Sequence, residues 1–386
     1  MSEQTTRREF LKDTGLVAGA IGVLNPMQAL AEAQTRATIK YPNGGAEHCI
    51  FIWLGGGAAQ IDMWDPKRVG DPKAKKAGSA YPAIDTAIPG VQVTEHLDQC
   101  AKILDRFCLL RTVNHDTKDE HAAATNRMHT GRPVSGTIVY PSIGSIVANQ
   151  RGKVTKGMPA YVVMGYPNLT RGPGFLGAQD GYIYLIDTEA GPAGLRRPSG
   201  ISDTRQTRRE QLLSGLRSGF RQRTSTDPAV KNYDSVIEEA FALGRGEFMN
   251  AFQLTNESGG LRESYGGEFG QRCLLARRLV QRGVRFIEVS FNLNFINGTG
   301  WDTHNEGQEK QHILIRQLDQ ALASLVLDLE KHKLFDKTLV VVATEFGRPA
   351  QFDDGGGRGH HSGSFSVVTA GGGLKNGQAV GGTNEL

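Results

Sequence analysis

The feature of this sequence that most restricts its fold is a series of short apolar segments ending in glycine or in polar residues. The clearest is Cys49–Leu54 (CIFIWL), which is followed directly by Gly55-Gly56-Gly57. A strand that is apolar on both faces is typical of a parallel sheet covered by helices on both sides. The first segment therefore favours a buried parallel strand.

Further apolar segments follow, and helical patterns separate them. Strands are predicted at 109–113, 160–164, 284–290, 338–344 and 364–370, and helices at 96–107, 117–129 and 308–332. A glycine- and proline-rich excursion at 166–200 precedes a mainly helical stretch at about 203–283. Alternating strands and helices predict an α/β sandwich with a mostly parallel sheet, in which we expect 203–283 to be a helical insertion. We expect the helix at 117–129 to begin with a capping box at Thr117–Glu120 and to stop before Gly131-Arg132-Pro133.

The first 31 residues have the order of an export signal. Thr6–Lys12 (TRREFLK) carries paired arginines, Gly15–Leu24 is a short apolar stretch, and Ala29-Leu30-Ala31 is a small-residue cleavage site. The arginine pair indicates the twin-arginine route, so we expect the twin-arginine export machinery as a partner and a periplasmic or secreted location. Residues 32–386 are expected to form a single domain.

Composition and cysteine spacing exclude several classes of protein. The sequence has 44 Lys and Arg against 40 Asp and Glu, which is too small an excess for a protein that binds nucleic acid. No apolar stretch reaches the ~18 residues that a membrane span needs. The cysteines at 49, 100, 108 and 273 form no C-x-x-C pair, so we expect buried free thiols and no cysteine zinc site.

Polar side chains able to bind metal follow several predicted strands. In open α/β sheets a ligand binds beyond the carboxyl ends of the strands, so residues at those positions are candidates. They are Asp62 and Asp65, His121, Asp302 and His304, Glu345 and Arg348, and, before the last strand, His360 and His361. Carboxylates and imidazoles together suit Zn²⁺, Mn²⁺ or a similar divalent ion. Two such ions ~4 Å apart could clamp a phosphoryl or sulfuryl group.

Several motifs occur in the order found in one bacterial protein family. They are the twin-arginine start, LGGGAAQIDMWDPK, HDTKDEHAAATNRMHTGRP, GWDTH, LVVVATEFGR, GRGHH and AGGGLKNGQAVG. From about residue 49 to its end, the chain resembles the family called domain of unknown function 1501. That family is similar to the alkaline phosphatase and sulfatase superfamily, so the resemblance implies a three-layer α/β/α sandwich with a one-metal or two-metal hydrolytic centre. The family usually continues past the segment that resembles 381–384, so we expect the chain to be truncated at its C-terminus.

The resemblance also implies roles for the candidate metal ligands. Asp302, His304 and either His360 or His361 would hold one ion. Glu345 would bind a second ion, although the histidine that usually follows this acidic residue is replaced by Phe346. An aspartate that is usual directly after the first strand is absent, and Asp62 or Asp65 is expected to substitute for it.

His121 occupies the place of the usual Ser or Thr nucleophile at the start of a helix. It could ligate the second ion or attack the substrate directly, or its presence could mean that there is no covalent catalysis. The exposed N–H groups at a helix start favour an anion, and we expect the same positive end to lower the pKa of the imidazole. Arg127 and Arg348 are the candidates for substrate binding.

Two functions are compatible with this pattern. The first, which we favour, is an exported metal-dependent hydrolase of phosphate or sulfate esters, acting on small molecules or polysaccharides with one or two ions of Zn²⁺ or a similar metal. The alternative is a non-catalytic binding or scaffold protein of the bacterial envelope on a sulfatase-like fold. His121, Phe346 and the displaced aspartate favour the alternative.

Overall fold

The fold was determined as a computed structural model. The structure describes residues 44–384 except 156, 167–168, 225–226, 246, 292–295 and 305–306. The predicted export signal at 1–31 lies outside the described residues, as do the last two positions of the chain.

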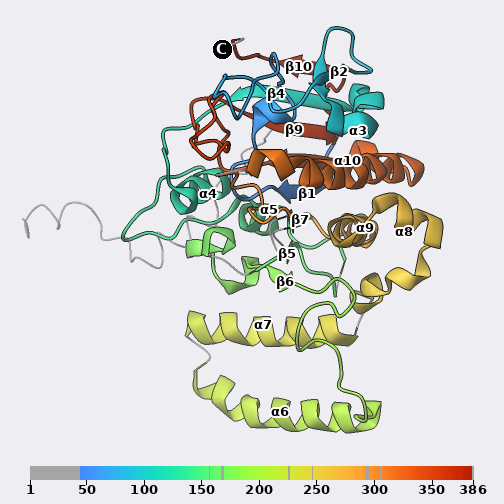
Figure 1. The fold of residues 1–386 in the computed structure, drawn as a ribbon. Coiled ribbons are helices and arrows are strands. Elements are labelled where there is room, and N and C mark those ends of the chain that lie inside the picture. The colour runs from blue at the N-terminus through green and yellow to red at the C-terminus, as the bar shows by residue number, and fades with distance from the viewer. Residues whose placement is uncertain are drawn as a thin grey trace, which may run out of the picture. The chain divides into compact units, whose positions relative to one another are not determined.

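The centre of the fold is a sheet of eight strands in the order β10-β4-β9-β8-β1-β7-β5-β6 (Figure 1). Its strands are β1 (His48–Trp53), β4 (Phe107–Val113), β5 (Tyr161–Met164), β6 (Ile183–Leu185), β7 (Phe286–Ser290), β8 (Thr338–Ala343), β9 (Phe365–Gly371) and β10 (Gln378–Val380). Only β9 runs antiparallel to its neighbours, so the prediction of a mostly parallel sheet is confirmed. A separate antiparallel pair joins β2 (Ala83–Asp85) to β3 (Gln92–Thr94).

Helices cover both faces of this sheet, and two further helices, α6 and α7, lie beyond its β6 edge (Figure 1). They are α3 (Asp98–Lys102), α4 (His121–Thr130), α5 (Ile143–Arg151), α6 (Asp203–Arg223), α7 (Pro228–Arg245), α8 (Gly259–Tyr265), α9 (Glu268–Gln281) and α10 (Gly307–Lys331). Strand β1 shows the layering residue by residue, because Ile50 and Ile52 belong to one apolar core while Phe51 and Trp53 belong to the other. Both faces of the sheet are therefore buried, as a three-layer α/β/α sandwich requires.

Two predicted helices differ from the structure at their ends. The stretch at 96–107 is broken into the short α3 between two 3₁₀ turns, at Glu95–Leu97 and Leu104–Arg106. Helix α4 begins at His121. Its cap is the carboxylate of Glu120, which accepts hydrogen bonds from the backbone N–H groups of Ala122 and Ala123. The capping box expected from Thr117 is therefore wrong. The predicted stop is confirmed, since Gly131 ends the helix at a φ of 68°.

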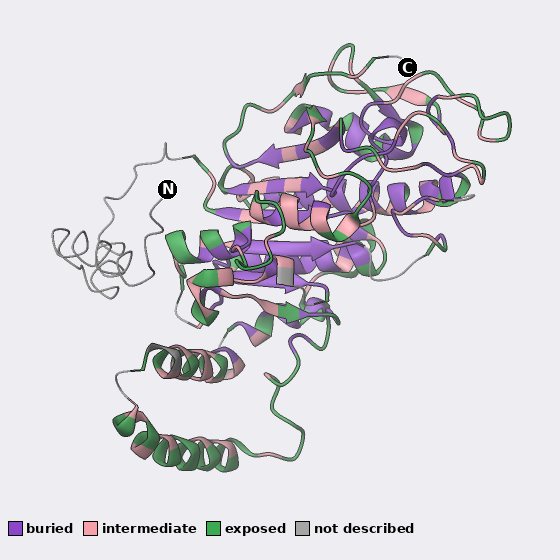
Figure 2. Cartoon of the chain, turned by 90° about the vertical axis from the view of Figure 1, so that its left-hand side faces the viewer, coloured by how far each residue is buried: buried purple, intermediate pink, exposed green. Residues whose placement is uncertain are grey.

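The helices between 203 and 283 differ in burial. Helix α9 is buried over most of its length and belongs to the larger core, whereas none of the side chains of α6 is buried. Helices α6 and α7 lie beyond the β6 edge of the sheet, where Figure 2 shows α6 as almost wholly exposed. The domain division made from the sequence stays a prediction.

The described residues agree with two further expectations. All four cysteines are free, and Cys100, Cys108 and Cys273 are buried. In the part of the chain that the structure describes, every helix is too short or too polar to cross a membrane.

Candidate metal centre

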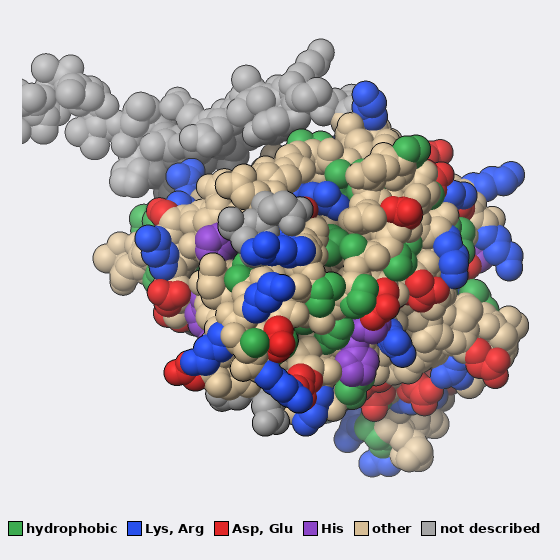
Figure 3. All heavy atoms as spheres, turned by 45° about the horizontal axis from the view of Figure 1, so that its top comes forward, with side chains coloured by type: hydrophobic (Ala, Val, Ile, Leu, Met, Phe, Trp, Pro, Cys, Tyr) green, Lys and Arg blue, Asp and Glu red, His purple; other side chains and the backbone are tan. Residues whose placement is uncertain are grey.

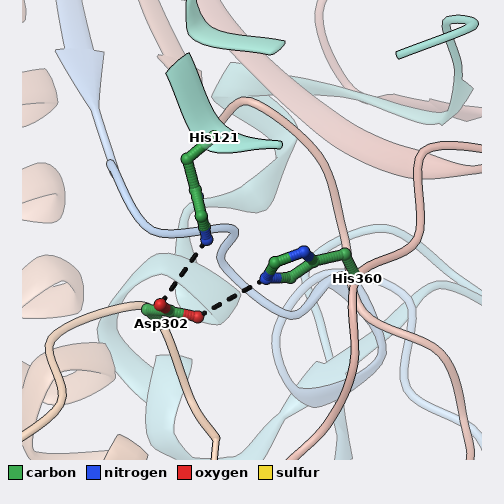
Figure 4. Close-up of side chains that lie close together, drawn as sticks. All are labelled: His121, Asp302 and His360. Atoms are coloured by element: carbon green, nitrogen blue, oxygen red, sulfur yellow. Dashed lines mark ion pairs between the residues drawn. The ribbon is translucent and has the colours of Figure 1, made fainter. Parts of the chain in front are cut away.

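Three segments that are distant in the sequence meet near the carboxyl ends of β7 and β8. His121 is the first residue of α4, Asp302 and His304 lie between β7 and α10, and His360 lies in the loop before β9. The side chains of His121, Asp302 and His360 point toward one another in Figure 4, with ligand-type atoms within 4.8 Å. The side chains of Asp302 and His304 are 40% and 43% exposed, so a solute can reach the centre.

Asp302, His304 and His360 place three ligand atoms at the spacing of a metal shell. The Nε2 atoms of the two histidines are 3.2 Å apart, and they lie 3.1 Å and 3.7 Å from Oδ1 of Asp302. Ligands bound to Zn²⁺ at 2.0–2.1 Å in a tetrahedron are about 3.3 Å from one another. The three atoms are spaced as ligands of one ion would be, and the guanidinium of Arg348 contacts two of them, Oδ1 of Asp302 at 2.6 Å and Nε2 of His304 at 3.4 Å.

The charge states of two of these ligands also suit a metal. Burial and the neighbouring guanidinium of Arg348 lower the pKa of His360, which favours the neutral imidazole that a metal binds. Burial alone would raise the pKa of Asp302, but His121 and Arg348 outweigh burial and lower it. Asp302 is therefore an anion at neutral pH.

His121 is held by a buried carboxylate and turns its other nitrogen to the centre. Its Nδ1 lies 2.7 Å from Oε1 of Glu345, while its Nε2 lies 3.5 Å from Oδ2 of Asp302, an ion pair drawn in Figure 4. Hydrogen bonds to Asp302 and Glu345 raise the pKa of His121 to about 9, against the effect of burial. The lowered pKa expected from the helix end is therefore wrong, because two carboxylates act on the ring more strongly than the helix does.

Glu345 reaches the centre as the partner of His121. It is 2% exposed, and its Oε1 also accepts a hydrogen bond of 2.8 Å from the backbone N–H of Gly56. Its Oε2 accepts one of 3.1 Å from the hydroxyl of Thr344. These contacts give Glu345 the role of positioning His121, whereas the sequence pattern made it a ligand of a second ion. Phe346 lies against His121, with ring centroids 4.7 Å apart.

Arg348 is fully buried and contacts both Asp302 and His304. Its Nη2 donates to Oδ1 of Asp302 at 2.6 Å. Its remaining N–H groups donate to the backbone oxygens of Gly56, Gly57 and Arg358. The prediction that Arg348 contacts substrate does not agree with this placement, since its donors are used inside the protein.

Two further predicted ligands lie outside the centre. Asp62 is fully buried, and its carboxylate accepts hydrogen bonds from Arg358 at 2.8 and 2.9 Å and from the backbone N–H of Ala80 at 2.7 Å. Asp65 is paired with Lys67 at 2.9 Å. Both carboxylates are used in structural contacts, so neither replaces the aspartate that is missing after β1.

The remaining candidates are separated from the centre as well. His361 is exposed, and its backbone pairs with that of Gly347. Of the two adjacent histidines, His360 is the one whose ring lies beside Asp302 and His304. Arg127 is paired with Asp116 at 2.9 Å.

The geometry can be set beside what is known of similar proteins. A family model described as "Protein of unknown function (DUF1501)" matches residues 46–386. The chain belongs to the DUF1501 family. The expected family resemblance is thereby confirmed, and a search of curated proteins gives no match.

Solved structures with partial similarity include three bacterial proteins. The lipoteichoic acid synthase LtaP from Listeria monocytogenes is 10% identical at a TM-score of 0.39, over 87% of this chain and 68% of that one. The PsFucS1 sulfatase from Pseudoalteromonas sp. is 10% identical at 0.35, over 91% of this chain and 66% of that one. Alkaline phosphatase from the Antarctic bacterium TAB5 is 10% identical at a TM-score of 0.33, over 87% of this chain and 95% of that one.

Proposed function

We propose that this DUF1501 protein is an exported metal-dependent hydrolase of phosphate or sulfate esters. The observation that carries the proposal is the placement of His121, whose Nε2 faces Asp302 at 3.5 Å while Glu345 holds the opposite nitrogen at 2.7 Å. A carboxylate–histidine pair of this kind fixes the ring so that one nitrogen can act on a bound ligand.

The division of work among the residues follows from these contacts. A divalent ion held by Asp302, His304 and His360 would supply Lewis-acid polarisation of an ester oxygen. His121 exchanges a proton with the reacting group at Nε2, and Glu345 keeps Nδ1 bonded so that the ring does not turn. Arg348 holds Asp302 in place from the buried side.

A second candidate function is that of a binding or scaffold protein. The guanidinium of Arg348 lies 2.6 Å from Asp302 and 3.4 Å from Nε2 of His304. This buried cation neutralises the ligand carboxylate without a metal, and that observation favours a centre that keeps its shape without turnover.

Hydrolysis of aryl phosphate and aryl sulfate esters tests the proposal. We expect the metal-loaded protein to cleave at least one of these esters, and His121→Gln to lower the rate by roughly 10²–10⁴-fold, as is usual for loss of a proton-transfer group. The change also leaves the buried Glu345 without its cationic partner, so the free energy of unfolding is expected to fall and rates are compared per folded molecule.

The exposed His361 supplies a matched control for this experiment. His361→Gln is expected to retain the wild-type rate, because its side chain is outside the centre. Absence of any cleavage by metal-loaded wild type, or an unchanged rate in folded His121→Gln, would refute the hydrolase and leave the scaffold function.

A further inference from the structure

Helix α6 carries an unusual concentration of positive charge. Its 21 residues include six arginines against Asp203 and Glu210. The excess of four equals the net charge of the whole chain. On the face drawn in Figure 3, in contrast, Lys and Arg are interspersed with Asp and Glu. This exposed helix thus carries an excess of positive charge, part of which acidic residues of α7 offset.

One side of α6 is tied to the rest of the molecule. Arg217 and Arg221 form ion pairs with Asp234 and Glu238 of α7, including one of 2.8 Å between Arg221 and Glu238. These contacts fix which face of α6 turns inward.

Another side of α6 exposes an apolar row. Leu212, Leu216 and Phe220 follow one another at intervals of four residues, so they lie along one face of the helix. They are 66%, 71% and 49% exposed. Large apolar side chains in a row on a surface helix indicate a contact surface.

Arginines stand at both ends of this row. Arg208 precedes Leu212 by four residues, and Arg223 follows Phe220 by three, so both lie on the apolar face. Neither has an ion pair among the described residues. A helix of this length extends for about 31 Å, with charge at its ends and apolar groups between them.

We propose that this face of α6 binds the surface of an anionic lipid bilayer. The phosphates of the headgroups would pair with Arg208 and Arg223, while Leu212, Leu216 and Phe220 enter the boundary between headgroups and acyl chains. The helix stands at the outer edge of the molecule in Figures 1 and 2, where it can approach a flat surface along its length. A second copy of the chain fits this face less well. If two α6 helices packed antiparallel, Arg208 of each would lie against Arg223 of the other, and these like charges repel.

A tryptophan reporter tests the proposal on the full chain. The natural Trp53, Trp64 and Trp301 are buried, so Phe220→Trp adds an exposed emitter on α6. With vesicles of equal parts phosphatidylglycerol and phosphatidylcholine, we expect its emission to move to shorter wavelength. Pure phosphatidylcholine vesicles should leave it unchanged.

Two sets of substitutions in the reporter protein separate α6 from other surfaces. We expect Leu212→Ser with Leu216→Ser, and separately Arg208→Gln with Arg223→Gln, to weaken vesicle binding by about tenfold or more. The exposed lysines at 118 and 375 provide a control, since changing both to Gln removes the same charge elsewhere and should leave binding unchanged.

Three results would overturn the proposal. The first is an emission that phosphatidylglycerol vesicles do not change, which would leave the face to a protein partner. The second is equal binding to pure phosphatidylcholine. The third is a change of emission that appears without vesicles, grows with protein concentration and is lost in the Leu212→Ser, Leu216→Ser protein. That result would show that a second copy of the chain binds this face.

Discussion

Buried arginines set the positions of several acidic side chains in this protein. Arg348 holds Asp302 at the candidate metal centre, and Arg358 holds Asp62 beneath it. Away from the centre, Arg171 pairs with the fully buried Glu288 of β7. Removing one partner of such a pair leaves an uncompensated charge in a region of low polarity, which is costly.

Asp62 is therefore expected to support the fold and to take no part in metal binding. Asp62→Ala leaves Arg358 buried without its carboxylate and should lower the free energy of unfolding by about 3–5 kcal/mol. The exposed Asp354, which pairs with Lys75, provides the control, and its change to Ala should leave the free energy of unfolding almost unchanged. Denaturant unfolding of both variants measures the difference. Equal stability of the two variants would show that the buried pair is not needed.

Glu288 makes the stability depend on pH in the acid range. Burial would raise its pKa, but His129 and Arg171 outweigh burial and lower the pKa from 4.5 to about 2. A carboxyl with a lowered pKa in the folded state stabilises the fold above pH 4.5, and this contribution is lost as the pH falls from 4.5 toward 2. The shift corresponds to roughly 3 kcal/mol.

Unfolding measured between pH 6 and pH 2.5 checks this expectation. Glu288→Gln should be less stable than wild type at pH 6, and the two curves should approach each other as the pH falls. Parallel curves would contradict the assigned pKa.

Residue types at strand ends predict which residues come together at the centre better than they predict how the side chains of those residues are directed. Asp302, His304 and His360 lie where the pattern places them, because the carboxyl ends of neighbouring strands meet at one edge. The choice of His360 over the adjacent His361, and the use of Glu345 to hold His121, depend on side-chain directions that loop backbones set. Spacing along the sequence does not contain those directions.

Among the elements, α4 shows how a local conformation fixes a functional residue. Asp119 has a φ of 55°, a left-handed conformation that no helix starting at Thr117 could include. The helix therefore begins two residues later, and His121 is its first residue. A sequence pattern cannot show this turn, because Thr117–Glu120 satisfies the capping box by residue type alone.

The cap of α4 is expected to contribute measurably to stability. Glu120→Ala removes the carboxylate that accepts from the N–H groups of Ala122, at 2.9 Å, and of Ala123. It should cost about 1 kcal/mol in thermal or denaturant unfolding, whereas Thr117→Ala should cost almost nothing. A larger loss from the change at Thr117 would restore the capping box and contradict the structure.

For the molecule as a whole, the strands were easier to predict than their arrangement. Continuous apolar runs such as Cys49–Leu54 identify buried strands, and the structure has β1 there. The antiparallel direction of β9 and the short edge strands β6 and β10 depend on contacts between distant segments. Three-residue strands also leave too few positions for a recognisable pattern.

Export of the folded chain should depend on the paired arginines near its start. Arg7→Lys with Arg8→Lys is expected to leave the protein in the cytoplasm with its signal attached, since the twin-arginine route requires that pair. Fractionation of cells followed by determination of the N-terminal residue measures this. Efficient export of the double variant would indicate the general secretory route.

The central claim is that Asp302, His304 and His360 hold one divalent ion. The most direct test is the metal content per chain of wild type, His360→Ala and His361→Ala, each purified in the folded state. We expect about one ion per wild-type chain, the same in His361→Ala, and an affinity lower by roughly 10–100-fold in His360→Ala. No bound metal in wild type, or equal content in all three proteins, would contradict the claim.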